Sequence, residues 1–252
     1  MSNKGLLRWG VISTARIATN KVIPAIQRSE FGRVVAIASR SQEAASAAGA
    51  ELGIDDCYGS YEALLGDPNI DAIYNPLPNH LHVPWTLKAL EAGKHVLCEK
   101  PLALSAGQAR SFVKAAADYP DLLVSEAFMY RFHPQWLRAK ELVDGAELGQ
   151  LRSIQTWFSY YTDDPDNIRH VAEWGGGGLM DIGCYPVSQA RWLFACEPVR
   201  VTAVAEIDDR FGVDRLTSAL LAFPGGQVTF TCSTQLQPHQ WTQLVCEKGR
   251  YE

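Results

Sequence analysis

The sequence predicts an α/β protein in which a doubly wound parallel sheet, a Rossmann domain, precedes an α+β domain with a mostly antiparallel open sheet. Up to residue 126, short apolar runs alternate with helical patterns. Beyond it, strands follow one another directly, and Pro224-Gly225-Gly226 forms a turn between two of them. Because 252 residues can bury two cores, we expect domains at 1–126 and 127–252.

In the first domain, each apolar run ends just before a helical pattern begins, which predicts parallel strands covered by helices on both faces. A sheet of this kind most often binds a nucleotide. In the second domain, one long helix precedes a strand with alternating polar and apolar residues. The expected strands are 6–12, 34–38, 71–75, 95–98, 122–124, 153–160, 199–207, 216–223, 227–234 and 241–246, and the clearest helices are 42–52, 81–91, 105–117 and 134–143.

The amino-acid composition excludes several classes of protein and of binding partner. The chain is 47% hydrophobic and 20% charged, as ordinary folded proteins are. A net charge of -5 without a cluster of Lys and Arg argues against nucleic acid as a partner. No apolar stretch is long enough for a membrane span or signal peptide. Six cysteines without paired spacing are typical of reduced thiols in a cytoplasmic protein, and we expect no metal site.

A lysine stands where a buried strand ends, in Glu99-Lys100-Pro101 after Val96-Leu97-Cys98. Active sites of open α/β sheets lie at this edge, and an ammonium group there can stabilise a deprotonated hydroxyl. Tyr185 supplies a candidate phenol. The alternative interpretation of Lys100 is a solvated surface lysine.

Two turns predict the cofactor. After the first strand, Ser13, Ala15 and Ala18 replace the three glycines of the usual dinucleotide fingerprint, yet small residues before a helix still suit a pyrophosphate. An ordinary strand-to-helix turn is the alternative. After the second strand, Ser39 and Arg40 stand where an acidic residue would bind the ribose of NAD. We therefore expect NADP, with NAD possible, unless Arg40 is only a solvated side chain.

Combined motifs over nearly the whole chain resemble the glucose-fructose oxidoreductase, inositol dehydrogenase and rhizopine-catabolism (Gfo/Idh/MocA) family. They resemble most the branch of dimeric dihydrodiol dehydrogenases and NADP-dependent D-xylose and glucose-type sugar dehydrogenases. Many relatives have histidine where this chain has Tyr185, which also favours that branch. The motifs are residues 8–18, 75–82, 99–101, 126–134 and 176–186.

The resemblance implies an NADP-dependent oxidoreductase that transfers hydride between NADP and the hydroxyl carbon of a sugar or polyol, of the aldose 1-dehydrogenase type. Alternatives are a trans-dihydrodiol dehydrogenase or anhydro-sugar reductase and, in another class, a non-catalytic NADP-binding regulator. It also implies a homodimer formed through the second domain's sheet. Family members are usually longer, so we expect the second domain to be incomplete and its sheet to keep an unpaired edge.

In the expected mechanism, Tyr185 takes the hydroxyl proton while hydride leaves the same carbon, and Lys100 lowers the pKa of Tyr185. Asp181, four residues earlier, orients Lys100 or a substrate hydroxyl, or else caps the helix that follows. Gly175 to Gly178 either admit substrate or form a flexible turn. Expected cofactor contacts are Ser13, Thr14, Ala15, Arg16, Ile17, Ser39, Arg40, Asn75, Pro76, Leu77, Asn79, His82, Glu99 and Lys100, and expected substrate contacts are Arg131, Trp157, Phe158, Arg169 and Tyr185.

Overall fold

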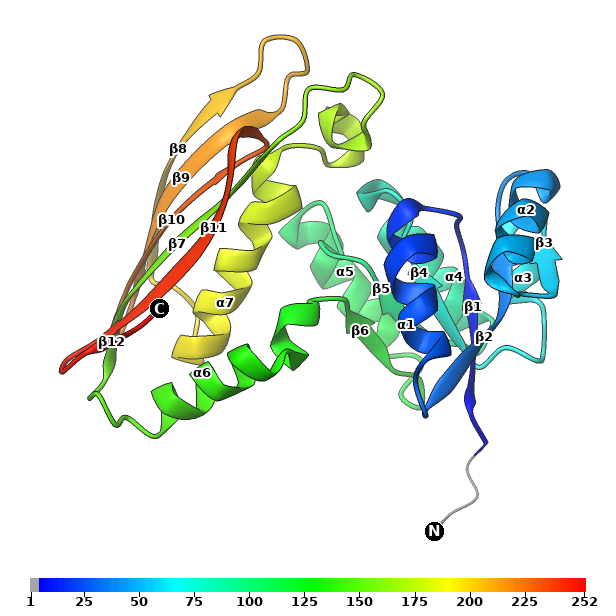
Figure 1. The fold of residues 1–252 in the computed structure, drawn as a ribbon, viewed down its shortest axis with the longest axis horizontal. Coiled ribbons are helices and arrows are strands. Elements are labelled where there is room, and N and C mark those ends of the chain that lie inside the picture. Colours follow the sequence, from blue (N-terminus) through cyan, green and yellow to red (C-terminus); the bar gives the residue numbers. More distant parts are fainter. Residues whose placement is uncertain (1–4) are drawn as a thin grey trace. The chain divides into compact units, whose positions relative to one another are not determined.

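The computed structural model describes residues 5–252, which divide into two compact units at Ala127 and Phe128 (Figure 1). The first unit is built on a six-stranded sheet in the order β3-β2-β1-β4-β5-β6, with every neighbouring pair parallel. The strand order runs outward from β1 to β3 on one side and from β4 to β6 on the other. It therefore changes direction between β1 and β4, which is where such sheets bind ligands. The strands are β1 Leu7–Val11, β2 Gly32–Ala38, β3 Asp56–Tyr58, β4 Ala72–Asn75, β5 His95–Cys98 and β6 Val124–Glu126.

Helices cover both faces of the first sheet, and each face has its own apolar core. Val11 faces one core and the adjacent Ile12 faces the other, because successive strand residues point to opposite sides. Fully burying one aliphatic side chain of this kind contributes about 1.5–3 kcal/mol. The helices are α1 Ile23–Gln27, α2 Gln42–Leu52, α3 Tyr61–Leu65, α4 His82–Glu91 and α5 Ala106–Ala116, with a π-helical turn Ala18–Val22 before α1.

Serine side chains begin three of these helices. The hydroxyl groups of Ser41, Ser60 and Ser105 each accept a backbone N–H three residues later, at 3.1–3.2 Å. The predicted fold class is confirmed, although β3 and α3 were not expected. At three and five residues they are too short for a recognisable period.

The second unit contains a six-stranded sheet in the order β12-β11-β7-β10-β9-β8. The pair formed by β7 and β10 is parallel and the others are antiparallel, as the predicted mostly antiparallel sheet requires. The predicted turn joins β9 to β10, and Gly226 is needed there because a Cβ would lie 2.3 Å from the Arg152 carbonyl oxygen. The strands are β7 Leu151–Tyr161, β8 Arg200–Ile207, β9 Asp214–Phe223, β10 Gly226–Ser233, β11 Gln235–Cys246 and β12 Arg250–Tyr251.

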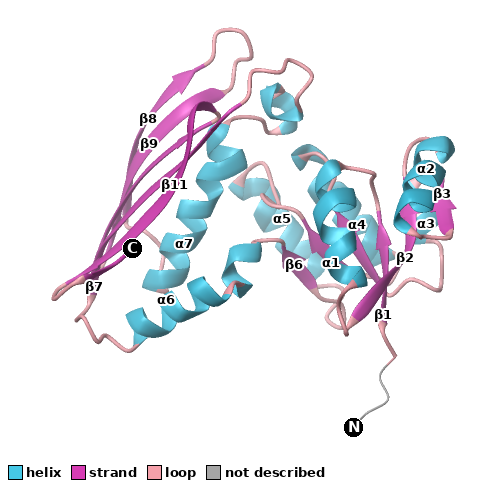
Figure 2. Cartoon of the chain, viewed as in Figure 1, coloured by secondary structure: helices cyan, strands magenta, loops and turns pink. Residues whose placement is uncertain are grey.

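Two helices of the second unit, α6 (Pro134–Asp144) and α7 (Cys184–Phe194), pack their apolar side chains against one face of this sheet (Figure 2). Ile154 and Val228 are fully buried at the centre of that core. The opposite face carries side chains that remain accessible, and β8 is exposed along its whole length. Within residues 5–252, no helix has the length and apolarity that crossing a membrane demands.

Candidate active site

The turn after β1 presents a helix start to the carboxyl edge of the first sheet. Ala15 N–H donates to the Ser13 hydroxyl at 3.0 Å, and the helical ladder opens with Thr19 N–H to the Ala15 carbonyl at 3.1 Å. The first N–H groups of a helix have no acceptor within it, so they can bind an anion. Arg16 is exposed beside them. Despite its missing glycines, this turn therefore fits the pyrophosphate of a dinucleotide.

Arg40 lies at the same edge, just after β2. The register pairs Val11 with Ile37, so the turns that follow β1 and β2 are neighbours. The side chain of Arg40 is exposed, and its charge opposes the rise that burial causes in the pKa of Tyr61. Ser39 supports the turn by donating its N–H to the Tyr58 carbonyl at 3.0 Å. The position suits a ribose phosphate, and the preference for NADP through Arg40 stays a prediction.

The loop after β4 is shaped by the completely buried Asn75. Its amide donates to the His82 carbonyl at 3.1 Å and to the Thr86 hydroxyl at 3.2 Å, and accepts the Leu77 N–H at 3.3 Å. The His82 ring is also buried, with both nitrogens against carbonyl oxygens. Both side chains therefore hold backbone in place, and contacts of Asn75, Pro76, Leu77, Asn79 and His82 with the cofactor stay predictions.

Residues 99–102 continue β5 along the same edge. Tyr74 donates its hydroxyl to the Glu99 carboxylate at 2.6 Å, and Leu102 N–H donates to the Glu126 carboxylate at 2.7 Å. The Lys100-Pro101 peptide is cis, and Lys100 is half-buried. The next helix, α5, begins only at Ala106, five residues after Pro101. Sequence reasoning missed the roles of Tyr74 and Glu126, although both stand at or next to strand ends.

In the second unit, Asp181 is 9% exposed and lies in a π-helical turn, Leu179–Gly183, directly before α7. Its carboxylate accepts the Tyr160 hydroxyl and pairs with the Arg169 guanidinium at 2.9 Å. Burial and the charge of Asp181 raise the pKa of Tyr160, so its phenol stays protonated. The helix-cap alternative for Asp181 is wrong, since α7 begins without a side-chain cap.

The glycine run after Arg169 permits close packing around this cluster. A Cβ on Gly176 would lie 2.4 Å from the Arg169 carbonyl oxygen, and one on Gly177 would lie 2.2 Å from the Asp214 carboxylate. Gly177 also has a φ of +105°, which favours glycine. The run is therefore neither a free flexible turn nor an open approach for substrate at these two positions. Arg169 pairs with Asp181 beside this run, and its contact with substrate stays a prediction.

Tyr185 lies in the first turn of α7 among aromatic rings. The ring centroids of Phe128, Phe158 and Tyr130 lie 5.5, 5.8 and 6.0 Å from its own. A hollow of about 760 Å³ within the second unit is lined by Tyr185 together with Phe158. This volume is in the range of small-molecule sites. Tyr185 thus combines a phenol with a largely apolar and aromatic surrounding.

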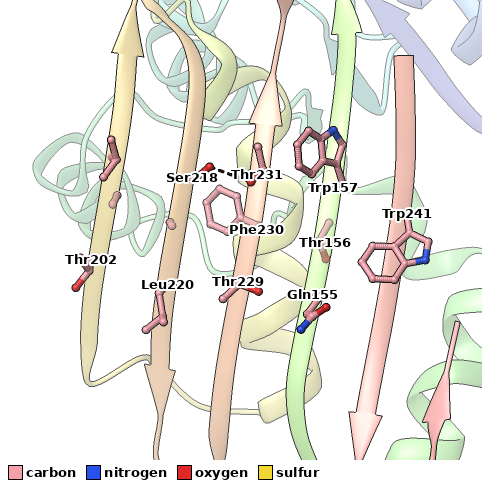
Figure 3. Close-up of a pocket in the computed structure, with 13 residues that line it drawn as sticks. Gln155, Thr156, Trp157, Thr202, Ser218, Leu220, Thr229, Phe230, Thr231 and Trp241 are labelled. Carbon is pink, nitrogen blue, oxygen red and sulfur yellow. Dashed lines mark hydrogen bonds between the residues drawn. The ribbon is translucent and has the colours of Figure 1, made fainter. Parts of the chain in front are cut away.

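Two predicted substrate contacts are separated by the pleat of β7. Phe158 packs against Tyr185 on the face covered by α7, whereas the side chain of the adjacent Trp157 lies on the opposite face with Trp241 (Figure 3). Trp157 still lines part of the hollow that Tyr185 lines, and its contact with substrate stays a prediction. Arg131 is exposed, with its guanidinium 5.6 Å from the ring centre of Trp192. Its contact with substrate stays a prediction.

Comparison with known proteins gives the family. Residues 7–127 match an oxidoreductase family with an NAD-binding Rossmann fold, and residues 136–252 match the Gfo/Idh/MocA C-terminal domain. The chain is 44% identical to D-xylose 1-dehydrogenase (NADP(+)) 2 of Haloferax volcanii, over 98% of this chain and 75% of that protein. It is 36% identical to mouse trans-1,2-dihydrobenzene-1,2-diol dehydrogenase, over 90% of this chain and 68% of that protein.

Comparison with solved structures indicates the same family. The 3-ketoreductase from Actinomadura kijaniata, in complex with NADP and TDP-benzene, is 34% identical, with a TM-score of 0.89 over 98% of this chain and 75% of that one. The predicted fold class, enzyme class and nicotinamide cofactor are confirmed by these findings. The first family region lies within the first unit and the second region lies within the second unit. The chain therefore belongs to the Gfo/Idh/MocA family of oxidoreductases.

Proposed function

We propose that the protein is an NADP-dependent dehydrogenase of the aldose 1-dehydrogenase type, which oxidises a hydroxyl-bearing carbon of an aldose or cyclic polyol. The observation that carries this proposal is the 44% identity to a D-xylose 1-dehydrogenase along 98% of the chain. The carboxyl edge of the first sheet supports it, because it offers a helix start for the pyrophosphate and the exposed Arg40 for a ribose phosphate.

The chain's own residues supply the proton transfer. NADP, when bound at the carboxyl edge of the first sheet, would supply the acceptor for the hydride of the substrate carbon. The phenolate of Tyr185 takes the hydroxyl proton of that carbon, and the ammonium group of Lys100 donates a hydrogen bond to the same oxygen. Asp181, fixed by Tyr160 and Arg169, accepts a hydrogen bond from a second substrate hydroxyl or from Lys100.

A second candidate is a trans-dihydrodiol dehydrogenase. The aromatic surrounding of Tyr185 favours it, because the rings of Phe128 and Phe158 would suit a flat apolar diol better than a sugar. The 36% identity to the mouse enzyme points in the same direction. An anhydro-sugar reductase and a regulator that binds NADP without turnover are the remaining alternatives.

A substrate panel separates these candidates. Aldoses, cyclic polyols, an anhydro-sugar and trans-dihydrodiols are each offered with NADP and with NAD, or with the reduced cofactor for the anhydro-sugar. Turnover is followed by absorbance of the reduced nicotinamide. We expect the highest kcat/KM for an aldose with NADP. Exclusive turnover of the diols or the anhydro-sugar would select the corresponding alternative. NADPH binding, measured by fluorescence, without turnover of any compound would select the regulator.

We also propose that a second copy of the chain covers the open face of the second sheet. Ser, Thr and Trp side chains of β7, β9, β10 and β11 line a shallow hollow of about 360 Å³ there, and Val204 of β8 is 76% exposed (Figure 3). Sedimentation velocity tests the homodimer, with Leu220→Lys as the disrupting variant. A wild-type protein that sediments as a monomer at all concentrations contradicts it.

A further inference from the structure

The ring of His82 joins two loops of the first unit. His82 is the first residue of α4 and is 1% exposed. Its Nδ1 lies 2.7 Å from the Pro101 carbonyl oxygen and its Nε2 lies 2.7 Å from the Leu77 carbonyl oxygen. A carbonyl oxygen only accepts hydrogen bonds, so a contact is a hydrogen bond only where the ring nitrogen carries a proton. Burial lowers the pKa of His82, so the ring is neutral and one of its two nitrogens donates. The ring therefore connects the loop after β4 to the segment that contains Lys100.

The contact with Pro101 involves the one residue of this segment that has no N–H group. Glu99 donates its N–H to the Asn75 carbonyl at 2.9 Å and accepts the Tyr74 hydroxyl at 2.6 Å. On the other side, Leu102 donates its N–H to Glu126 at 2.7 Å. Proline has no N–H, so its carbonyl is the one backbone group through which it can be hydrogen bonded.

We infer that His82 is a positioning residue whose Nδ1–H holds the Pro101 carbonyl and thereby fixes the backbone that carries Lys100. The inference rests on the proposed function, because it assigns His82 its effect through Lys100. A displacement of about 1 Å of a catalytic group can lower turnover about a hundredfold. His82 acts through this backbone rather than through contact with the cofactor or substrate, since its ring is buried and both nitrogens face carbonyl oxygens.

Two matched substitutions separate the contacts of the ring. In His82→Asn, the amide nitrogen stands about where Nδ1 does and can keep the bond to Pro101. In His82→Gln, the amide nitrogen stands about where Nε2 does and can keep the bond to Leu77 instead. The neutral ring donates one hydrogen bond, which His82→Asn keeps and His82→Gln exchanges for the one to Leu77, so similar thermal stabilities of the two variants are expected. His95→Asn, at the start of β5, removes a ring that accepts the Leu123 N–H and serves as the control.

If His82 positions Lys100, kcat falls about 10- to 100-fold in His82→Gln and less than about threefold in His82→Asn and His95→Asn. NADPH affinity should differ less than about threefold between the two His82 variants, because both replace the same side chain, so a difference in kcat between them reports the contact with Pro101. An equal loss of kcat in the two His82 variants, or no loss in either, would overturn the inference.

Two measurements do not depend on turnover. Hydrogen exchange of the peptide containing Leu102 in the cofactor-free protein should be about tenfold faster in His82→Gln than in His82→Asn, and equal rates would contradict the inference. In the wild-type protein, ¹⁵N NMR of the His82 ring should show a protonated Nδ1, and an unprotonated Nδ1 would also overturn it. A wild-type protein without turnover on the panel would refute the proposed function, and these two readouts would still decide on His82.

Discussion

The two edges of the first sheet use polar side chains for different purposes. At the amino ends of the strands, Arg8 and Asp71 form a paired ion bridge with contacts of 2.7 and 3.0 Å, and Lys94 donates to the carbonyls of Asp67 and Ile70, both at 2.7 Å. These bonds tie the start of one strand to the segment before another. At the carboxyl ends, buried side chains fix the backbone that follows the strands, as the amide of Asn75 does.

The contrast follows from the direction of the chain in a parallel sheet. Every carboxyl end leads into a loop and the start of a helix, where N–H groups lack acceptors and a ligand can supply them. At the amino ends, charged side chains pair with one another and with backbone carbonyl groups. We therefore expect substitutions at the carboxyl edge to alter turnover and cofactor choice, and substitutions at the amino edge to alter the free energy of unfolding.

The largest effect is expected at Lys100, together with its proposed partner in the second unit. Lys100→Met and Tyr185→Phe should each lower kcat about 100- to 10,000-fold, because each removes one group from proton transfer. NADPH binding, measured by fluorescence titration, should stay within about threefold of wild type. Near-normal turnover in both variants would refute the roles proposed for them. The urea midpoint of Lys100→Met should match that of wild type, because side chains at the carboxyl edge are expected to affect turnover and not the free energy of unfolding.

The same contrast explains what the sequence could predict. Lys100 and Asn75 could be placed at one edge because each ends an apolar run, and parallel strands bring such ends together. The partners of Asp181 could not be found, because Tyr160 lies 21 residues earlier on another element. The alternation of β7 was visible, yet it also put Trp157 and Phe158 on opposite faces, which a list of aromatic residues conceals. Nothing in the local pattern indicates that His82 bridges two carbonyls.

A smaller effect is expected at Arg40, which lies at the carboxyl edge outside the proton-transfer chemistry. Arg40→Asp should move the preference from NADP toward NAD, because it removes a charge-assisted contact and repels the 2′-phosphate. A change of about 10- to 100-fold in the ratio of the two dissociation constants is expected for loss of a charged hydrogen bond. Arg33→Asp, at the amino end of β2, is the matched control and should leave the ratio unchanged. An unaltered ratio in both variants would make Arg40 a solvated neighbour.

The smallest effect is expected at the amino edge and concerns folding alone. Hydrogen bonding to Arg8 lowers the pKa of Asp71 to about 2, from an ordinary value of 3.8. Because the folded pKa is depressed, the pair stabilises the protein above about pH 4 and loses this effect as the pH falls toward 2. With both side chains about one third exposed, solvent screening reduces the effect to about 1–2 kcal/mol.

Asp71→Asn should accordingly lower the free energy of unfolding by about that amount at pH 7, measured by urea titration, while kcat stays within about twofold of wild type. Asn carries no charge to lose, so the difference from wild type should narrow in titrations that step down from pH 4. A difference that stays constant to pH 2.5 would mean that shape rather than charge stabilises this edge. A large loss of kcat with an unchanged free energy of unfolding would contradict the difference between the two edges. A substitution at the amino edge would then affect catalysis at the opposite ends of the strands.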